Sequence, residues 1–398
     1  MNWVQEMAFR YEADTIANRR HLHRCPELGF QEFQTSDYIA EKLSEYGLIV
    51  QRGFGELKTG VMGTLRGGEG PVLNLRADID ALEIQEENSI DYQSLNQKNM
   101  HACGHDGHAA MLLTAARILS ENRLKVPGTI KFVFQPAEEG PYPGGACSVL
   151  SSGSLDDADG AFAMHVCPEL PVGQINIHRG TGTASADMFK IVLNGKGGHG
   201  SEPAKAIDPI VMAAQTINAF QTIISRGIDA RDASVLSLCT IRGGHMGTVI
   251  PETVTMTGTL RNFDESVRNT VVSKMEAILS GVSEMFGGSF SFDVSRGYPA
   301  LVNNDKMVDL AARVCEKMVG KQNVHILTKP VMSGEDFAYV AKRFPASMLW
   351  LGCRNEDLGI VNPLHSPNFQ MDERCLSIGS ALFVEFALEF LLERRISE

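Results

Sequence analysis

The sequence predicts an α/β protein in two parts: a main domain built on a mixed, mostly parallel sheet, and an inserted ferredoxin-like α+β domain. Three observations lead to this prediction. The 398 residues are too many for one ordinary hydrophobic core. Strand and helix patterns alternate in both outer parts of the chain, as they do around parallel sheets. Residues 184–296 predict the order strand, helix, strand, strand, helix, strand, which is that of a split βαβ unit.

The elements of the main domain follow from apolar periodicity and from the signals at their ends. In chain order we expect helices over residues 3–20 and 35–46, strands over 48–52, 60–66 and 72–76, a helix over 109–119, and strands over 129–135 and 161–166. After the insertion we expect a helix over 305–319, a strand over 324–327, a helix over 335–343, a strand over 348–353, a long loop to residue 370, and an amphipathic closing helix over 381–392.

The inserted domain should have four strands and two long helices. The strands are expected over residues 188–194, 235–242, 254–261 and 290–295, and the helices over 207–226 and 265–285. The main domain is then discontinuous and consists of residues 1–183 and 297–398. About 110 residues is a comfortable size for an independent inserted domain.

A nine-residue stretch, Met100 to His108, contains three His, one Cys and one Asp. Thiols and imidazoles are the ligands that Zn²⁺-like ions prefer. Cys103 and His105 are two positions apart, so on an extended segment they would point to the same side. A structural zinc knuckle is the alternative, but it needs a second pair such as Cys-x-x-Cys, which this chain lacks. The stretch therefore predicts a metal site, with a catalytic site favoured over a structural one.

Several acids and one further histidine follow or end the predicted strands of the main domain. In an open α/β sheet, ligands bind at the edge formed by the carboxyl ends of the strands. Taken singly, Glu138 and Glu139 could be a solvated loop end, His165 a core histidine, and His365 an ordinary loop residue. Their convergence on one edge favours a site. Its expected members are Asp78, Asp80, Glu138, Glu139 and His165.

Composition excludes several classes of protein. A formal net charge of −12 argues against nucleic-acid binding and against an anionic membrane surface. We see neither a secretory signal at residues 1–6 nor a run of about 18 apolar residues, so we expect no membrane span. The eight Cys are scattered, which is typical of reduced thiols in a cytoplasmic protein.

Six motifs in order resemble the M20 metallopeptidase family, in the amidohydrolase branch that includes hippurate hydrolases, N-acyl-L-amino acid amidohydrolases and auxin-conjugate hydrolases. The motifs are Arg19-Arg20-His21-Leu22-His23 with Pro26-Glu27-Leu28-Gly29-Phe30, Arg76-Ala77-Asp78-Ile79-Asp80-Ala81-Leu82, His101 to His108, Pro136-Ala137-Glu138-Glu139-Gly140, Ser333-Gly334-Glu335-Asp336-Phe337, and Leu364-His365-Ser366-Pro367.

The resemblance implies a site for two divalent ions, Zn²⁺ or Mn²⁺ first and Co²⁺ or Ni²⁺ as alternatives. The implied ligands are Cys103, which would bridge both ions, and His105, Glu139, His165 and His365. Glu138 corresponds to the general base. His199 corresponds to a residue that supports the oxyanion in a neighbouring subunit and contacts substrate, and Arg261 to one that holds a substrate carboxylate. The inserted domain would be a lid and dimerisation domain, so a homodimer or tetramer through residues 184–296 is implied.

The sequence thus predicts a metal-dependent amidohydrolase that cleaves N-acyl amino acids, small molecules, to a carboxylate and a free amino acid. We expect a metal-activated water, Glu138 as general base, and catalytic roles for His199 and Asp80. A carboxypeptidase or dipeptidase with the same site is the alternative, and a non-catalytic binding protein is a third. Thr248 stands where the branch usually has Asn, and Glu83 where it usually has Pro, so the substrate stays open.

Overall fold

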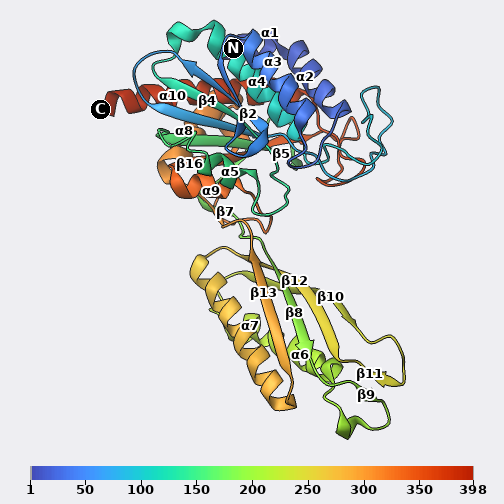
Figure 1. Cartoon of the computed structure of the whole chain (residues 1–398). Helices are drawn as coiled ribbons and strands as arrows, with labels where there is room; N and C mark the ends of the chain where they lie inside the picture. Colours follow the sequence, from blue (N-terminus) through green and yellow to red (C-terminus); the bar gives the residue numbers. More distant parts are fainter. Residues whose placement is uncertain (1, 398) are drawn as a thin grey trace. The chain divides into compact units, whose positions relative to one another are not determined.

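A computed structural model describes residues 2–397, with side chains up to residue 394. The chain forms two compact units (Figure 1). The first comprises Met1–Gly182, Val302–Lys329 and Asp336–Glu398, and the second comprises Thr183–Leu301 and Pro330–Glu335. The two short strands β7 (Gly180–Thr183) and β14 (Leu301–Asn303) mark points where the chain passes from one unit to the other.

The first unit is built on an eight-stranded mixed sheet with the order β1-β2-β4-β3-β5-β16-β6-β15. Strand β3 runs parallel to β4 and to β5, and β16 runs parallel to β5, so these four strands end at the same edge. The strands are β1 (Ile49–Phe54), β2 (Leu57–Arg66), β3 (Val72–Asp78), β4 (Thr129–Gln135), β5 (Gly160–Pro171), β6 (Ile175–His178), β15 (Val324–Leu327) and β16 (Ala346–Arg354).

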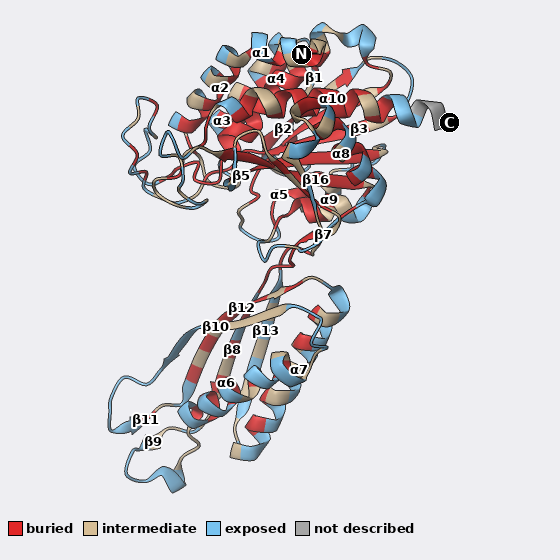
Figure 2. Cartoon of the chain, turned by 180° about the vertical axis from the view of Figure 1, so that it is seen from behind, coloured by how far each residue is buried: buried red, intermediate tan, exposed pale blue. Residues whose placement is uncertain are grey.

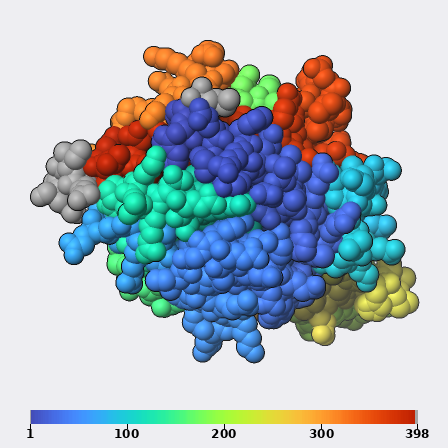
Figure 3. All heavy atoms as spheres, turned by 90° about the horizontal axis from the view of Figure 1, so that it is seen from above, coloured from blue at the N-terminus to red at the C-terminus, as the bar shows by residue number. Residues whose placement is uncertain are grey.

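Helices cover both faces of this sheet and bury its strands (Figure 2). Helices α4 and α10 pack on each other and on β3, while α5 and α9 contact each other on the opposite face (Figure 1). The N-terminal helices lie beside the C-terminal one (Figure 3). The helices are α1 (Trp3–Arg10), α2 (Glu12–Arg24), α3 (Phe33–Glu45), α4 (His105–Glu121), α5 (Gly145–Ser151), α8 (Asp305–Val319), α9 (Phe337–Arg343) and α10 (Arg374–Ser397).

The closing helix α10 is not amphipathic, so that expectation was wrong. Its residues from Ala381 to Leu391 are nearly all buried, including Glu385, which pairs with Lys317 of α8. Within the described residues, its stretch Arg374–Arg394 is long and apolar enough to span a membrane by length and composition alone, and 78% of the window tested is buried inside the protein. This helix is therefore part of the hydrophobic core of the first unit.

Two other expectations needed correction. The single helix predicted over residues 3–20 is two helices, because Tyr11 interrupts the regular pattern between α1 and α2. Strand β5 continues to Pro171 rather than ending at Val166, because it pairs with β16 over that length. His165 consequently lies inside a strand and not at its end.

The second unit has one antiparallel sheet with the order β10-β12-β8-β13 and two helices that contact it. The chain order β8-α6-β10-β12-α7-β13 confirms the ferredoxin-like prediction. A short pair of strands, β9 and β11, extends from this core. The elements are β8 (Asp187–Asn194), β9 (Gly198–His199), α6 (Pro209–Arg226), β10 (Ser234–Gly243), β11 (Val249–Ile250), β12 (Thr253–Asn262), α7 (Glu265–Phe286) and β13 (Ser289–Arg296).

Candidate metal centre

The loop that carries Cys103 turns sharply into helix α4. Gly104 has φ +83°, and a Cβ there would lie 2.4 Å from Cγ2 of Val166, so only glycine fits this turn. His105 is the first residue of α4. The expectation that Cys103 and His105 share an extended segment was therefore wrong, because the turn and the helix start, and not strand alternation, bring both side chains to the site.

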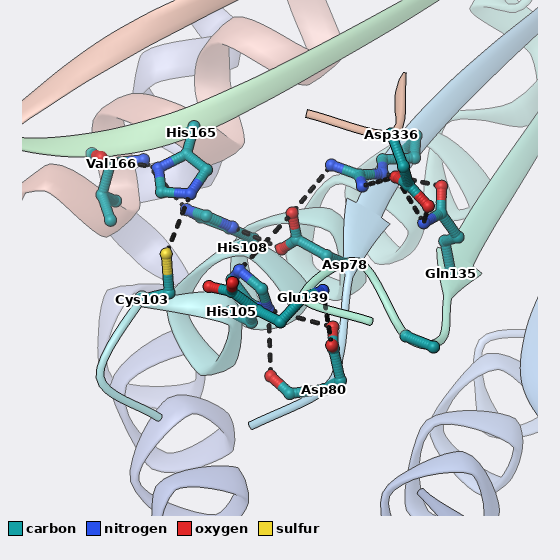
Figure 4. Close-up of polar contacts among 12 residues, drawn as sticks. Asp78, Asp80, Cys103, His105, His108, Gln135, Glu139, His165, Val166 and Asp336 are labelled. Carbon is teal, nitrogen blue, oxygen red and sulfur yellow. Dashed lines mark hydrogen bonds and ion pairs between the residues drawn. The ribbon is translucent and has the colours of Figure 1, made fainter. Parts of the chain in front are cut away.

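The first group of donor atoms consists of Cys103, His105 and His165, all buried (Figure 4). Nε2 of His165 lies 3.4 Å from Sγ of Cys103, and its Nδ1 lies 2.7 Å from the carbonyl oxygen of Val166. A carbonyl oxygen only accepts hydrogen bonds, so Nδ1 carries the proton. Nε2 then has a lone pair that can bind a metal ion. Each candidate donor atom of the group lies within 4.8 Å of the others.

His105 is held by Asp80 from behind. Its Nδ1 lies 2.9 Å from the backbone oxygen and 3.2 Å from Oδ1 of Asp80, while its buried Nε2 has no hydrogen-bond partner among the described residues. An imidazole fixed through one nitrogen by a carboxylate and open at the other is the arrangement found for metal-binding histidines. This Nε2, which makes no hydrogen bond and lies 3.8 Å from Oδ2 of Asp78, is the observation that best fits a bound cation.

The second group consists of Cys103, Glu139 and His365, so Cys103 belongs to both groups. Nε2 of His365 lies 2.8 Å from Oε1 of Glu139. His365 has φ +62°, and its N–H donates to the carbonyl oxygen of Ala102 at 2.9 Å. The long loop after β16 is thereby tied to the loop that carries Cys103.

Glu138 is buried and groups with His105 and Glu139. Its neighbour Glu139 is turned toward His365 and donates its backbone N–H to Oδ2 of Asp80 at 2.9 Å. On an extended segment the two adjacent acids would point in opposite directions. The backbone instead turns at Ala137, which has φ +52°.

Burial and neighbouring charges shift the pKa values of the donor groups in this cluster. Burial and the nearby Glu139 raise the pKa of the Cys103 thiol well above its usual value. Burial lowers the pKa of His105, but Asp78 and Asp80 outweigh burial and raise it to about 10. Burial lowers the pKa of His165 to about 3. A thiol, three imidazoles and acids whose possible ligand atoms lie close together fit divalent cations, which stabilise a thiolate and carboxylates.

His101 and His108 lie outside the two donor groups above, although a ring nitrogen of His108 lies within 4.8 Å of possible ligand atoms of Asp78 and His105. His108 is used at both nitrogens, because Nδ1 lies 2.5 Å from Oδ1 of Asp78 and Nε2 accepts the N–H of Val166 at 2.9 Å. His101 is buried, and burial lowers its pKa to about 3. Asp80 thus orients His105, while Asp78 orients His108.

A buried ionic network lies behind the loop and was not predicted as such. Oδ2 of Asp106 accepts from Nε of Arg19 at 2.7 Å and lies 2.8 Å from Nδ1 of His23, whose Nε2 lies 3.1 Å from Oε1 of Glu86. Asp106 directly follows His105, so the network fixes the start of α4. The motif Arg19 to His23 was the only sequence signal of it.

The remaining predicted residues lie in the second unit. His199 is exposed on β9, with its Nδ1 2.7 Å from Oγ of Ser201. Arg261 lies near the end of β12 and donates from a guanidinium nitrogen to the carbonyl oxygen of Leu260 at 2.9 Å. Neither residue belongs to the donor groups described above.

Comparison with known proteins gives consistent results. The family described as Peptidase family M20/M25/M40 matches residues 74–389. Thermostable carboxypeptidase 2 of Saccharolobus solfataricus is 37% identical over 94% of this chain and 95% of its own. N-acetylcysteine deacetylase of Bacillus subtilis is 37% identical over 94% of this chain and 96% of its own. The crystal structure of the Bacillus subtilis YXEP protein, described as a dinuclear metal binding peptidase from M20 family, matches with a TM-score of 0.83 and 34% identity over 96% of this chain and 99% of its own.

Proposed function

Because the chain belongs to peptidase family M20/M25/M40 and is a metal-dependent hydrolase of amide bonds, we propose that it cleaves N-acyl amino acids to a carboxylate and a free amino acid. The observation that best supports the proposal is the situation of Glu138. It is a buried acid beside two donor groups that share Cys103, and its neighbour Glu139 is engaged by His365. We assign proton transfer to Glu138 and ion binding to Glu139.

We propose Cys103, His105, Glu139, His165 and His365 as the residues that hold two divalent ions. When bound, such ions lower the pKa of a water molecule and polarise the scissile carbonyl. Glu138 then takes the proton of the attacking water and delivers it to the leaving nitrogen. Asp80 keeps His105 in the orientation that exposes its Nε2.

The second unit supplies the remaining proposed groups. His199 of a partner subunit would donate to the oxyanion of the tetrahedral intermediate, and Arg261 would hold the carboxylate of the substrate. Exposure of His199 in the single chain agrees with a residue that completes a site elsewhere. A homodimer through the second unit is part of this proposal.

A carboxypeptidase or dipeptidase with the same site is the second candidate. The similarity to a protein named thermostable carboxypeptidase favours it, whereas the similarity to a protein named N-acetylcysteine deacetylase favours the first. Both reactions use the same water, base and oxyanion contacts, so they differ in the group that precedes the scissile amide.

The deciding experiment compares N-acetyl amino acids, N-benzoyl amino acids and dipeptides on protein reconstituted with Zn²⁺, Mn²⁺, Co²⁺ or Ni²⁺. We expect kcat/KM for at least one N-acyl amino acid to exceed that for every dipeptide by about tenfold, or ~1.4 kcal/mol. The reverse order would select the peptidase. Absence of hydrolysis with all four metals would contradict both.

A further inference from the structure

The motif Pro26 to Phe30 has no part in the donor groups, yet the turn over residues 27–32 lies against both loops that carry the candidate acids. The carbonyl oxygen of Glu27 accepts the N–H of Ala81, next to Asp80, at 2.8 Å. The Glu27 carboxylate accepts the N–H groups of Gln34 and Thr35 in the first turn of α3, at 3.2 and 2.9 Å. The 27–32 turn is therefore anchored to α3 and to the strand end below the site.

Glu32, at the end of this turn, contacts the backbone just before the proposed base. Its side chain is fully buried, and Oε1 accepts the N–H of Ala137 at 2.8 Å. Ala137 has φ +52°, a left-handed conformation that a residue with a Cβ adopts only where its surroundings enforce it. Glu138 follows directly, so the direction of its side chain depends on this turn.

The segment over residues 136–140 is held on its other sides as well. A Cβ on Gly29 would lie 2.1 Å from the carbonyl oxygen of Gly140 and 3.1 Å from Cβ of Ala137. The N–H of Gly145 donates to the carbonyl oxygen of Ala137 at 3.0 Å. With these contacts fixed, loss of the acceptor at Glu32 would leave the Ala137 N–H buried and unpaired, which the backbone could relieve only by turning.

Burying the carboxyl group of Glu32 costs desolvation free energy, which packing alone would not require. Burial, with a further contribution from Asp80, raises the pKa of Glu32 to about 7. A leucine would fill similar space without that cost, so the hydrogen bond to Ala137 is the reason we see for an acid here.

We infer that Glu32 is a positioning residue for Glu138: its Oε1 holds the Ala137 N–H, maintains the left-handed turn and thereby aims the Glu138 carboxylate. This inference rests on the proposed function, in which Glu138 is the general base. It assigns to the 27–32 turn the task of orienting the base, separate from metal binding.

The test compares Glu32→Gln, which keeps an oxygen acceptor of the same length, with Glu32→Leu, which removes it. At saturating metal we expect Glu32→Leu to lower kcat about 10- to 100-fold, because small displacements of a catalytic group cost that much. KM and metal content should stay near the wild-type values. Glu32→Gln should restore most of kcat, which a role in packing alone would not require. Wild-type kcat in Glu32→Leu, or equal losses in both variants, would overturn the inference.

Two further measurements keep the test decisive. If Glu32→Leu does not fold, Glu32→Asp asks the same question, because its shorter carboxylate cannot reach the Ala137 N–H, and wild-type kcat in that variant would overturn the inference.

Hydrogen exchange of the peptide that covers residues 136–140 needs no substrate. We expect faster exchange in Glu32→Leu or Glu32→Asp and unchanged exchange in Glu32→Gln, and equal exchange in all would overturn the inference. If the wild type hydrolyses no N-acyl amino acid while exchange behaves as expected, the proposed function fails and the contact itself stands.

Discussion

Nε2 of His165 lies 3.4 Å from Sγ of Cys103, although 62 positions separate the two residues in the chain. Cys103 also groups with Glu139 and His365, so one thiol is common to two sets of candidate ligands. A soft thiolate sulfur between two sets of nitrogen and oxygen donors would be suited to bridge two borderline cations.

The exchange Glu138→Gln should abolish most turnover and leave metal content unchanged. The amide cannot accept a proton, and loss of general-base catalysis lowers kcat by about 10²- to 10⁴-fold. Steady-state kinetics and elemental analysis of the same preparation measure both quantities. Near-normal turnover would remove Glu138 from the mechanism.

Cys103→Ala and His365→Ala should differ in metal stoichiometry. Cys103 belongs to both donor groups and His365 to one. Cys103→Ala should therefore weaken the binding of both ions, and His365→Ala mainly the binding of one. Elemental analysis after dialysis against a weak chelator gives the count per chain. Cys147→Ala is the matched control, because Cys147 belongs to none of the candidate donor groups among the described residues. Equal stoichiometry in Cys103→Ala and His365→Ala would contradict a shared thiolate.

If His199 acts in a partner subunit, two inactive variants should complement each other. A mixed dimer of Glu138→Gln and His199→Ala contains one site with an intact base and an intact donated histidine. We therefore expect activity to reappear when the two proteins are mixed and allowed to exchange subunits. Activity that never exceeds the sum of the separate variants would show that His199 does not act across subunits.

His23 should make stability depend on pH. Burial lowers its pKa, but Asp106 and Glu86 outweigh burial and raise it above the ordinary value of 6.5. A group whose pKa is raised on folding contributes its full stabilisation below the unfolded pKa and loses it as pH rises through the folded pKa. The wild type should therefore have a larger free energy of unfolding than His23→Gln. This difference should be largest near pH 6 and should shrink as pH rises above 6.5. Urea unfolding of both proteins across this range measures the difference, and a difference that is constant or grows with pH would contradict the assignment.

Arg76 should be a large contributor to stability. It is buried and donates to Oδ2 of Asp78 at 2.7 Å and to Oδ1 of Asp336 at 2.9 Å. Removing one partner of a buried ion pair costs about 3–5 kcal/mol, because the other charges stay buried. We expect Arg76→Met to reduce the free energy of unfolding by that order. Arg313→Ala, which removes an exposed pair with Glu393, is the control and should cost about 0–1 kcal/mol. Equal effects in the two variants would contradict this role of Arg76.

The fold was largely predictable because apolar alternation is strong where strands are buried. The strand over residues 129–135 matches β4 at both ends, and each strand of the four-stranded sheet β10-β12-β8-β13 appears within two residues of its expected bounds. The strand β6 and the helix α5 were not predicted, because β6 is short and polar at alternate positions and α5 is rich in Gly and Ser.

The candidate site was predictable as a set of residue types but not as a geometry. The resemblance implied Cys103, His105, His165 and His365 as ligands, but residue types and spacing alone do not distinguish His105, whose Nε2 makes no hydrogen bond, from His108, whose nitrogens both do. That difference arises from Val166 and Asp78, which come from other strands. The contact between Glu32 and Ala137 also joins positions 105 residues apart, which spacing along the chain does not reveal.

The most direct measurement is anomalous X-ray diffraction from crystals of the metal-reconstituted protein. We predict two metal peaks that share Sγ of Cys103 as a ligand at about 2.3 Å. His105 and His165 should bind at one peak, Glu139 and His365 at the other, and Glu138 should remain unligated beside them. A single peak, or peaks beyond coordination distance of Cys103, would contradict the dinuclear site and the function proposed from it.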